Sequence, residues 1–104
     1  MKADLILKSS EQAETFALSG DRATVGRSIN AHVRLSDQLV SREHCELLRL
    51  GDRFVVRDLG SSNGTFVNGT NITEKVLEWG DKILVGESVL IFVFDEKEGD
   101  SDTD

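Results

Sequence analysis

Three short segments carry residue types that can bind an anion. The first is Gly26-Arg27, the second is Ser41 to His44, and the third is DLGSSNGTFVNG, from Asp58 to Gly69. A guanidinium holds a phosphate through two parallel N–H groups, and hydroxyls and backbone amides can donate to the remaining oxygens. Taken singly, each segment also fits a plainer reading: a solvated arginine, a serine-started loop beside a tucked histidine, and a turn.

Catalysis and metal binding fit these residues poorly. Besides carboxylates, only His32, His44 and Cys45 are available to zinc, which needs three or four ligands with loop spacing. No nucleophile-elbow pattern surrounds Ser41, and GSSNGT lacks the lysine of a Walker loop. We therefore predict no catalytic residues, no metal, no cofactor and no enzymatic activity.

Most of the net negative charge lies at the C-terminal end of the chain. The 104 residues carry a net charge of −7, of which the last ten contribute −5 and the other 94 contribute −2. We predict one domain over residues 1–94 and an acidic, disordered tail over 95–104. A nearly balanced domain argues against general nucleic-acid binding, which needs a basic face. It leaves room for a single bound phosphate at a local cluster of arginines.

The cysteine count and the apolar runs predict where in the cell the protein is found. Cys45 is the only cysteine, so no internal disulfide can form, which fits a reducing compartment. No run approaches the ~20 apolar residues of a membrane span. We predict a cytoplasmic monomer with no membrane partner.

Turn signals divide the chain into short strands. Gly20-Asp21, Gly51-Asp52, Asn68-Gly69 and Gly86-Glu87 each separate two β-branched or apolar runs. Asn-Gly favours the type I′ turn and Gly-X the type II′ turn, both of which suit paired strands. We expect four successive antiparallel hairpins.

The remaining patterns complete an all-β prediction. The final run alternates apolar residues on both faces, which predicts a central strand over 89–94. We read Glu11–Leu18 as a strand and Glu74–Trp79 as a strand or turn. Many short strands with close turns predict a sandwich of two antiparallel sheets. Longer connections at 28–32, 36–42 and 60–64 would form the binding loops at one end.

Taken in order and spacing, the three segments resemble the forkhead-associated (FHA) domain family. The family has Gly-Arg at a strand end, then Ser-x-x-His, then an aspartate-led GSxNGT stretch and a second Asn-Gly. The matches here are Gly26-Arg27, Ser41-x-x-His44, Asp58 with GSSNGT at 60–65, and Asn68-Gly69. The resemblance extends from about Leu5 to Phe94.

The resemblance implies an 11-stranded β-sandwich that binds phosphothreonine peptides through its loops. The partner would be a protein phosphorylated by a Ser/Thr kinase. Arg27 would grip the phosphate as a fork, with Ser41 donating its hydroxyl, Arg42 its backbone N–H and guanidinium, and Ser62 a hydroxyl or N–H. The Asn63 amide both donates and accepts, which suits the main chain of an extended peptide.

The resemblance also assigns residues that support the site. His44 would form hydrogen bonds across the loops and fix Ser41, and Gly26 would end the strand that presents Arg27. Gly64 and Gly69 would adopt backbone that other residues resist. Thr65 and Asn68 would hold the loops together.

Two other functions remain open at this point. The domain could be a phosphate-independent interaction scaffold that dimerises or binds a partner through a sheet face. Alternatively, Ser101 and Thr103 lie among acids that suit an acidophilic kinase, and a phosphorylated Thr103 could dock in the domain's own site or a neighbour's and switch the module off. Leu39, Val40 or residues 28–31 are near enough in sequence to read the peptide beyond the phosphate.

Overall fold

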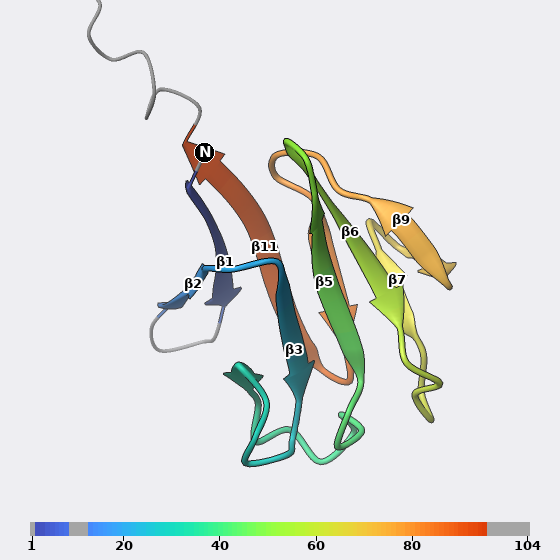
Figure 1. Ribbon diagram of the computed structural model, residues 1–104. Coiled ribbons are helices and arrows are strands. Elements are labelled where there is room, and N and C mark those ends of the chain that lie inside the picture. The colour runs from blue at the N-terminus through green and yellow to red at the C-terminus, as the bar shows by residue number, and fades with distance from the viewer. Residues whose placement is uncertain (1, 9–12, 96–104) are drawn as a thin grey trace, which may run out of the picture.

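The structure is a sandwich of two β-sheets (Figure 1). It is a computed structural model, and it describes residues 2–8 and 13–95. In spatial order, the six-stranded sheet contains β2 (Ala13–Leu18), β1 (Lys2–Lys8), β11 (Ser88–Asp95), β10 (Lys82–Val85), β7 (Thr65–Val67) and β8 (Thr70–Ile72). The five-stranded sheet contains β4 (Val33–Arg34), β3 (Arg22–Gly26), β5 (Cys45–Leu50), β6 (Arg53–Asp58) and β9 (Glu74–Val76). The predicted 11-stranded all-β sandwich is confirmed.

One strand pair departs from the antiparallel prediction. β3 and β4 pair in parallel, with Val25 opposite Val33. A parallel pair needs a connection that returns the chain to the starting end. The segment 27–32 makes this return over only six residues, and β4 is correspondingly short, at two residues.

The last strand is central, as its apolar alternation predicted. β11 lies between β1 and β10. Leu90 and Phe92 face the core and are 0% and 1% exposed, whereas Val89 and Ile91 are partly exposed on the outer face. β11 ends at Asp95, one residue beyond the predicted domain end. The rest of the predicted tail, with Ser101 and Thr103, lies outside the described residues.

Three of the four turn signals form hairpins. Asn68 and Gly69 both have positive φ, 52° and 88°, as a type I′ turn requires, and they join β7 to β8. Gly51 and Gly86 open the β5–β6 and β10–β11 turns with φ of 66° and 60°. Gly20-Asp21 was wrongly predicted as a hairpin, because β2 and β3 belong to different sheets and the turn carries the chain across the sandwich.

The two predicted segments outside the hairpins are largely strands. Residues 13–18 of the 11–18 prediction form β2, and residues 11–12 lie outside the described part. Within 74–79, residues Glu74–Val76 form β9 before the chain turns. Among the residues described, no helix has the length and apolarity needed to cross a bilayer.

The core lies between the sheets and contains the single thiol. Its most buried side chains come from both sheets, among them Leu5, Val25, Leu47 and Phe92. Cys45 is fully buried, and this burial, with the nearby charge of Asp58, raises the pKa of its thiol to about 12. The thiol therefore stays protonated and unreactive at neutral pH.

Three loops meet at one end of the sandwich, the lower end in Figure 1. They are the β3–β4 loop (27–32), the β4–β5 loop (35–44) and the β6–β7 loop (59–64). The β10–β11 turn reaches the same end (Figure 1). The strands therefore bring together the first two segments singled out from the sequence and the 59–64 part of the third.

Candidate functional site

Gly26 lets two loops lie side by side. A Cβ atom at Gly26 would overlap the backbone carbonyl of Arg42, so this position has no room for a side chain. Just beyond it, the amides of Arg27 and Ser28 donate to the carbonyls of Ser41 and Arg42, both at 3.1 Å. The end of β3 is thus fixed against the β4–β5 loop.

Arg27 is held by one nitrogen and leaves the others available. Its Nε donates to the carbonyl of Val40 at 2.5 Å, and the side chain is exposed. Among the described residues, its terminal nitrogens have no hydrogen-bond or ion-pair partner. The guanidinium therefore has a fixed position and an open edge that can face an anion.

His44 joins the second loop to the third. Its ring is completely buried. The Ser41 amide donates to Nδ1 at 3.0 Å, and Nε2 donates to the carbonyl of Gly64 at 2.8 Å. This pattern places the ring proton on Nε2, so His44 acts as a neutral connector. These are the cross-loop hydrogen bonds that we expected of His44, including the one that fixes Ser41.

Ser41 and Ser62 meet directly. The Ser62 amide donates to the Ser41 hydroxyl oxygen at 3.0 Å. This bond uses the Ser62 amide, so only its hydroxyl remains to donate to a ligand. The Ser41 oxygen accepts one bond and keeps its own O–H as a donor. The two hydroxyls thus lie on neighbouring loops at one point of the surface.

Asn63 connects the same two loops further out. One of its amide N–H groups donates to the carbonyl of Leu39 at 2.9 Å. The side chain is exposed, and its oxygen has no donor among the described residues. The amide is thereby oriented, with one acceptor and one donor directed to solvent.

Asp58 organises the β6–β7 loop. One carboxylate oxygen accepts from the amides of Gly60 and Ser61, both at 3.0 Å, and the other accepts from the hydroxyls of Ser61 and Thr65, both at 2.6 Å. Burial of the carboxylate opposes ionisation, but the hydrogen bonds from Ser61 and Thr65 outweigh it and lower the pKa of Asp58. Thr65 thus holds the loop as expected.

Ser61 and Gly64 complete the turn of this loop. The Ser61 hydroxyl oxygen also accepts from the Gly64 amide at 3.0 Å, and Gly64 has a φ of 88°. We assigned no role to Ser61 from the sequence, although aspartate followed by small hydroxyl residues is a known turn signal.

Asp37 is a second residue that the sequence analysis missed. Its carboxylate accepts from the Glu87 amide at 2.6 Å and the Ser88 hydroxyl at 2.8 Å, which ties the β4–β5 loop to the β10–β11 turn. It also accepts from the Leu39 amide at 2.9 Å. No local motif announces this contact, because the partners are about fifty positions apart in the chain.

Asn68 lies outside the loop cluster, so it does not hold the loops together as we expected. Gly69 adopts the left-handed backbone that we expected of it, with a φ of 88°. The Asn68 side chain donates to Asp81 at 2.9 Å and accepts from the Lys82 amide at 3.0 Å. In the β7–β10 pair, Thr65 lies opposite Val85 at the end nearest the loops, and Val67 lies opposite Ile83 at the other end. Asn68 and Asp81 come next at that other end, away from the loops. The second Asn-Gly holds a hairpin to the β9–β10 connection.

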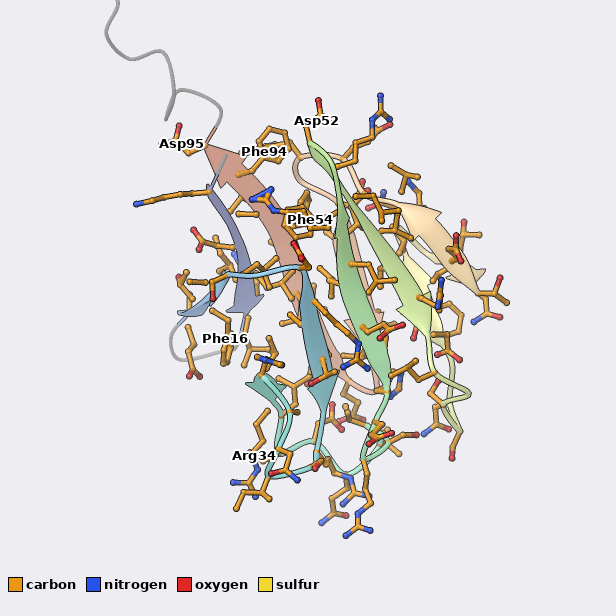
Figure 2. The ribbon with its side chains drawn as sticks, viewed as in Figure 1. Phe16, Arg34, Asp52, Phe54, Phe94 and Asp95 are labelled. Carbon is orange, nitrogen blue, oxygen red and sulfur yellow. The ribbon has the colours of Figure 1, made fainter. Side chains whose placement is uncertain are left out.

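Arg42 faces a hollow beside Arg27. The lining residues are Arg27, Ser28, Ile29, Asn30, Arg34, Arg42 and Glu43. The Arg42 side chain is exposed, and its amide has no acceptor among the described residues. Arg34, labelled in Figure 2, lies at this end of the molecule. An acidic chain therefore presents three guanidinium groups around one depression.

Comparison with known proteins agrees with this architecture. The model of the FHA domain family matches residues 23–86. Over 95 residues, the chain is 38% identical to the oxoglutarate dehydrogenase inhibitor of Corynebacterium jeikeium, covering 90% of this chain and 66% of that protein. It is 36% identical over 98 residues to the glycogen accumulation regulator GarA of Mycolicibacterium smegmatis, covering 93% of this chain and 62% of GarA.

Solved structures give the same result. The structure superposes with a TM-score of 0.86 on an FHA domain solved in a study of phosphothreonine-dependent FHA domain interactions, at 34% identity, covering 91% of this chain and 98% of that one. The chain spans less than two thirds of the length of both curated relatives. FHA domains are interaction modules. From the matched family model, the strand arrangement and the loop geometry, we conclude that this chain belongs to the FHA domain family.

Proposed function

We propose that this domain binds proteins phosphorylated on threonine and that the phosphate sits over Arg27, Ser41 and Ser62. The observation that carries the proposal is the set of unused donors at the loop end. The terminal nitrogens of Arg27 and the hydroxyl hydrogens of both serines have no acceptor among the described residues. A phosphothreonine offers three acceptor oxygens and nearly two negative charges to these groups.

The surrounding groups would extend the contact along the peptide. The free amide of Arg42 adds a donor beside Ser41. The open oxygen and N–H of Asn63 match the main chain of an extended peptide, which alternates donors and acceptors. Leu39 is exposed next to Asn63 and offers an apolar contact to a later peptide residue.

The relatives support a regulatory role for such binding. One is named as an inhibitor of oxoglutarate dehydrogenase and another as a regulator of glycogen accumulation, and the solved FHA domain comes from work on phosphothreonine-dependent interactions. We propose accordingly that a Ser/Thr kinase creates the ligand and that binding regulates the phosphorylated partner. A cytoplasmic, monomeric state stays a prediction.

Fluorescence anisotropy with three matched peptides tests the proposal. We expect tight binding of a phosphothreonine peptide with randomised flanks, weaker binding of the phosphoserine version, and no measurable binding of the unphosphorylated version. Arg27→Ala should weaken phosphothreonine binding about tenfold to hundredfold, because each hydrogen bond to a charged group contributes about 1.5–3 kcal/mol. Equal binding of the phosphorylated and unphosphorylated peptides would contradict the proposal.

Two further variants separate charge and folding from recognition. Arg27→Lys keeps the charge but loses the fork, so it should recover only part of the affinity. Arg53→Ala removes an exposed arginine at the β5–β6 turn, next to Asp52 at the opposite end in Figure 2, and should leave binding unchanged. Thermal unfolding of all three variants checks that the fold is intact.

A second candidate function rests on the outer face of the six-stranded sheet. Leu84 pairs with Val89 and Phe66, and Ile6 pairs with Ile91, so apolar side chains line neighbouring strands on the face turned away from the core. Such a stripe suits phosphate-independent association. If Arg27→Ala left binding to a native partner unchanged while Leu84→Lys abolished it, this second function would replace the first.

A further inference from the structure

Arg34 occupies a position that the phosphate contacts do not explain. It is the last residue of β4, and its side chain is exposed in the hollow that also receives Arg27 and Arg42. Its Nε lies 3.4 Å from the Arg27 carbonyl, which places the side chain against the backbone of the phosphate-gripping residue. Its terminal nitrogens have no partner among the described residues.

The hollow contains more guanidinium groups than the proposed phosphate contact uses. Three arginines and one glutamate line it, a local excess of two positive charges in a chain whose net charge is −7. No ion pair joins Glu43 to any of the three within the described part of the chain. In the proposed contact, Arg27 and the hydroxyls of Ser41 and Ser62 hold the phosphate, and Arg34 takes no part in it. Arg34, in the strand that follows the β3–β4 loop, stays available for a second negative group.

We propose that Arg34 is a specificity-determining residue that selects ligands with an acidic side chain, aspartate or glutamate, close to the phosphothreonine. This inference rests on the proposed function and adds a sequence preference to it. The contact would be an ion pair at the surface. It would therefore contribute modestly to affinity, and added salt would weaken it.

A peptide series tests this assignment. Each peptide carries one phosphothreonine in an alanine background, and a single residue at each of the four positions on either side is glutamate or glutamine. At one or more positions, wild-type protein should bind the glutamate peptide about twofold to fivefold more tightly than its glutamine twin, the range of an exposed ion pair. Arg34→Gln should abolish that difference and change the affinity for the all-alanine phosphopeptide less than twofold.

Control variants and salt sharpen the outcome. Arg34→Lys should retain part of the glutamate preference, Arg53→Gln should retain all of it, and raising the salt from 0.05 M to 0.5 M should reduce it. An equal loss of affinity for both members of every pair in Arg34→Gln would place Arg34 on the phosphate and overturn the inference. Wild type that binds the phosphopeptides with no glutamate preference would also overturn it and leave the proposed function standing. Wild type that binds no phosphopeptide would overturn both.

Discussion

Gly26 sets the distance between the two loops that carry Arg27 and Ser41. Gly26 allows this close approach because it has no side chain: the Arg42 carbonyl occupies the space that a Cβ would fill. The paired amides of Arg27 and Ser28 depend on the same close approach. One absent methyl group therefore determines where the guanidinium stands relative to the serine hydroxyl.

Gly26→Ala should weaken both folding and peptide binding. The added methyl forces the β4–β5 loop away, and we expect a loss of about 1–3 kcal/mol in the free energy of unfolding, measured by urea titration. Phosphopeptide affinity should drop at least tenfold. Gly20→Ala is the matched control, because Gly20 has a φ of 79° but nothing within 4 Å of its Cβ position. It should cost about 1 kcal/mol of stability and leave the affinity unchanged. Unaltered binding by Gly26→Ala would show that the loop spacing is not critical.

At the scale of elements, two of the three loops are anchored by a carboxylate. Asp58 holds the β6–β7 loop internally, and Asp37 ties the β4–β5 loop to the β10–β11 turn. For both, burial works against ionisation, and the donated hydrogen bonds outweigh it and lower the pKa. The loops are thus firm because charged acceptors replace the regular hydrogen bonds of strands.

This anchoring predicts a dependence of stability on pH. A carboxyl group whose pKa is lower in the folded state stabilises the fold above its unfolded pKa, about 3.9 for aspartate. That contribution is lost as the pH falls through the folded value. We expect the free energy of unfolding to be flat near neutrality and to fall below about pH 4, as followed by urea titrations at successive pH values.

Asp58→Asn isolates one of these carboxylates. Its amide nitrogen cannot accept, so two of the four hydrogen bonds are lost, and stability at pH 7 should fall by about 2–4 kcal/mol. The acid-induced decrease in the free energy of unfolding should become shallower, because Asp58 no longer contributes to it. Part of the decrease should remain, because Asp37 and Asp81 still contribute. Asp52→Asn, at the exposed β5–β6 turn, serves as the control and should match wild type throughout. An Asp58→Asn variant as stable as wild type would remove the proposed anchor.

The sequence predicted local elements better than their partners. Turn chemistry located Gly51-Asp52 and Gly86-Glu87 correctly, because the φ requirement is local. The same signal failed at Gly20-Asp21, since a turn residue does not specify which sheet receives the next strand. β4 and β9, at two and three residues, are too short to show a period.

The same distinction applies to the site. Arg27, Ser41, His44 and Asn63 were found from motif spacing, and the structure brings all four to one end of the sandwich. Asp37 was missed because its partners are distant in sequence. Asn68 was misplaced because an Asn-Gly pair announces a turn and says nothing of its surroundings.

For the whole molecule, the stability of the loops depends on strands that the family model leaves out. The match covers residues 23–86, whereas β1 and β11, two interior strands of the six-stranded sheet, lie outside it. Leu5, Leu90 and Phe92 come from these two strands and are among the most buried side chains. The matched segment therefore lacks much of what the six-stranded sheet contributes to the core.

A fragment of residues 23–86 should consequently fail to fold. Removing a large buried side chain costs about 2–5 kcal/mol, and the loss of three such residues approaches or exceeds the 5–15 kcal/mol that stabilises a typical domain. We expect poorly dispersed amide signals in a ¹H–¹⁵N NMR spectrum. A fragment of residues 1–95 should give the dispersed spectrum of the full chain and the same phosphopeptide affinity. A dispersed spectrum from 23–86 would show that the matched segment retains enough of the core to fold without β1 and β11.

The burial of Cys45 has a practical consequence. Its protonated thiol is buried between the sheets. A maleimide dye should therefore not react with the native chain while it remains folded. A cysteine introduced on the β3–β4 loop would then be the sole labelling position, without any need to remove the natural one. Conversely, the rate at which the dye reacts with Cys45 in the unmodified protein would report the rate at which the sandwich opens.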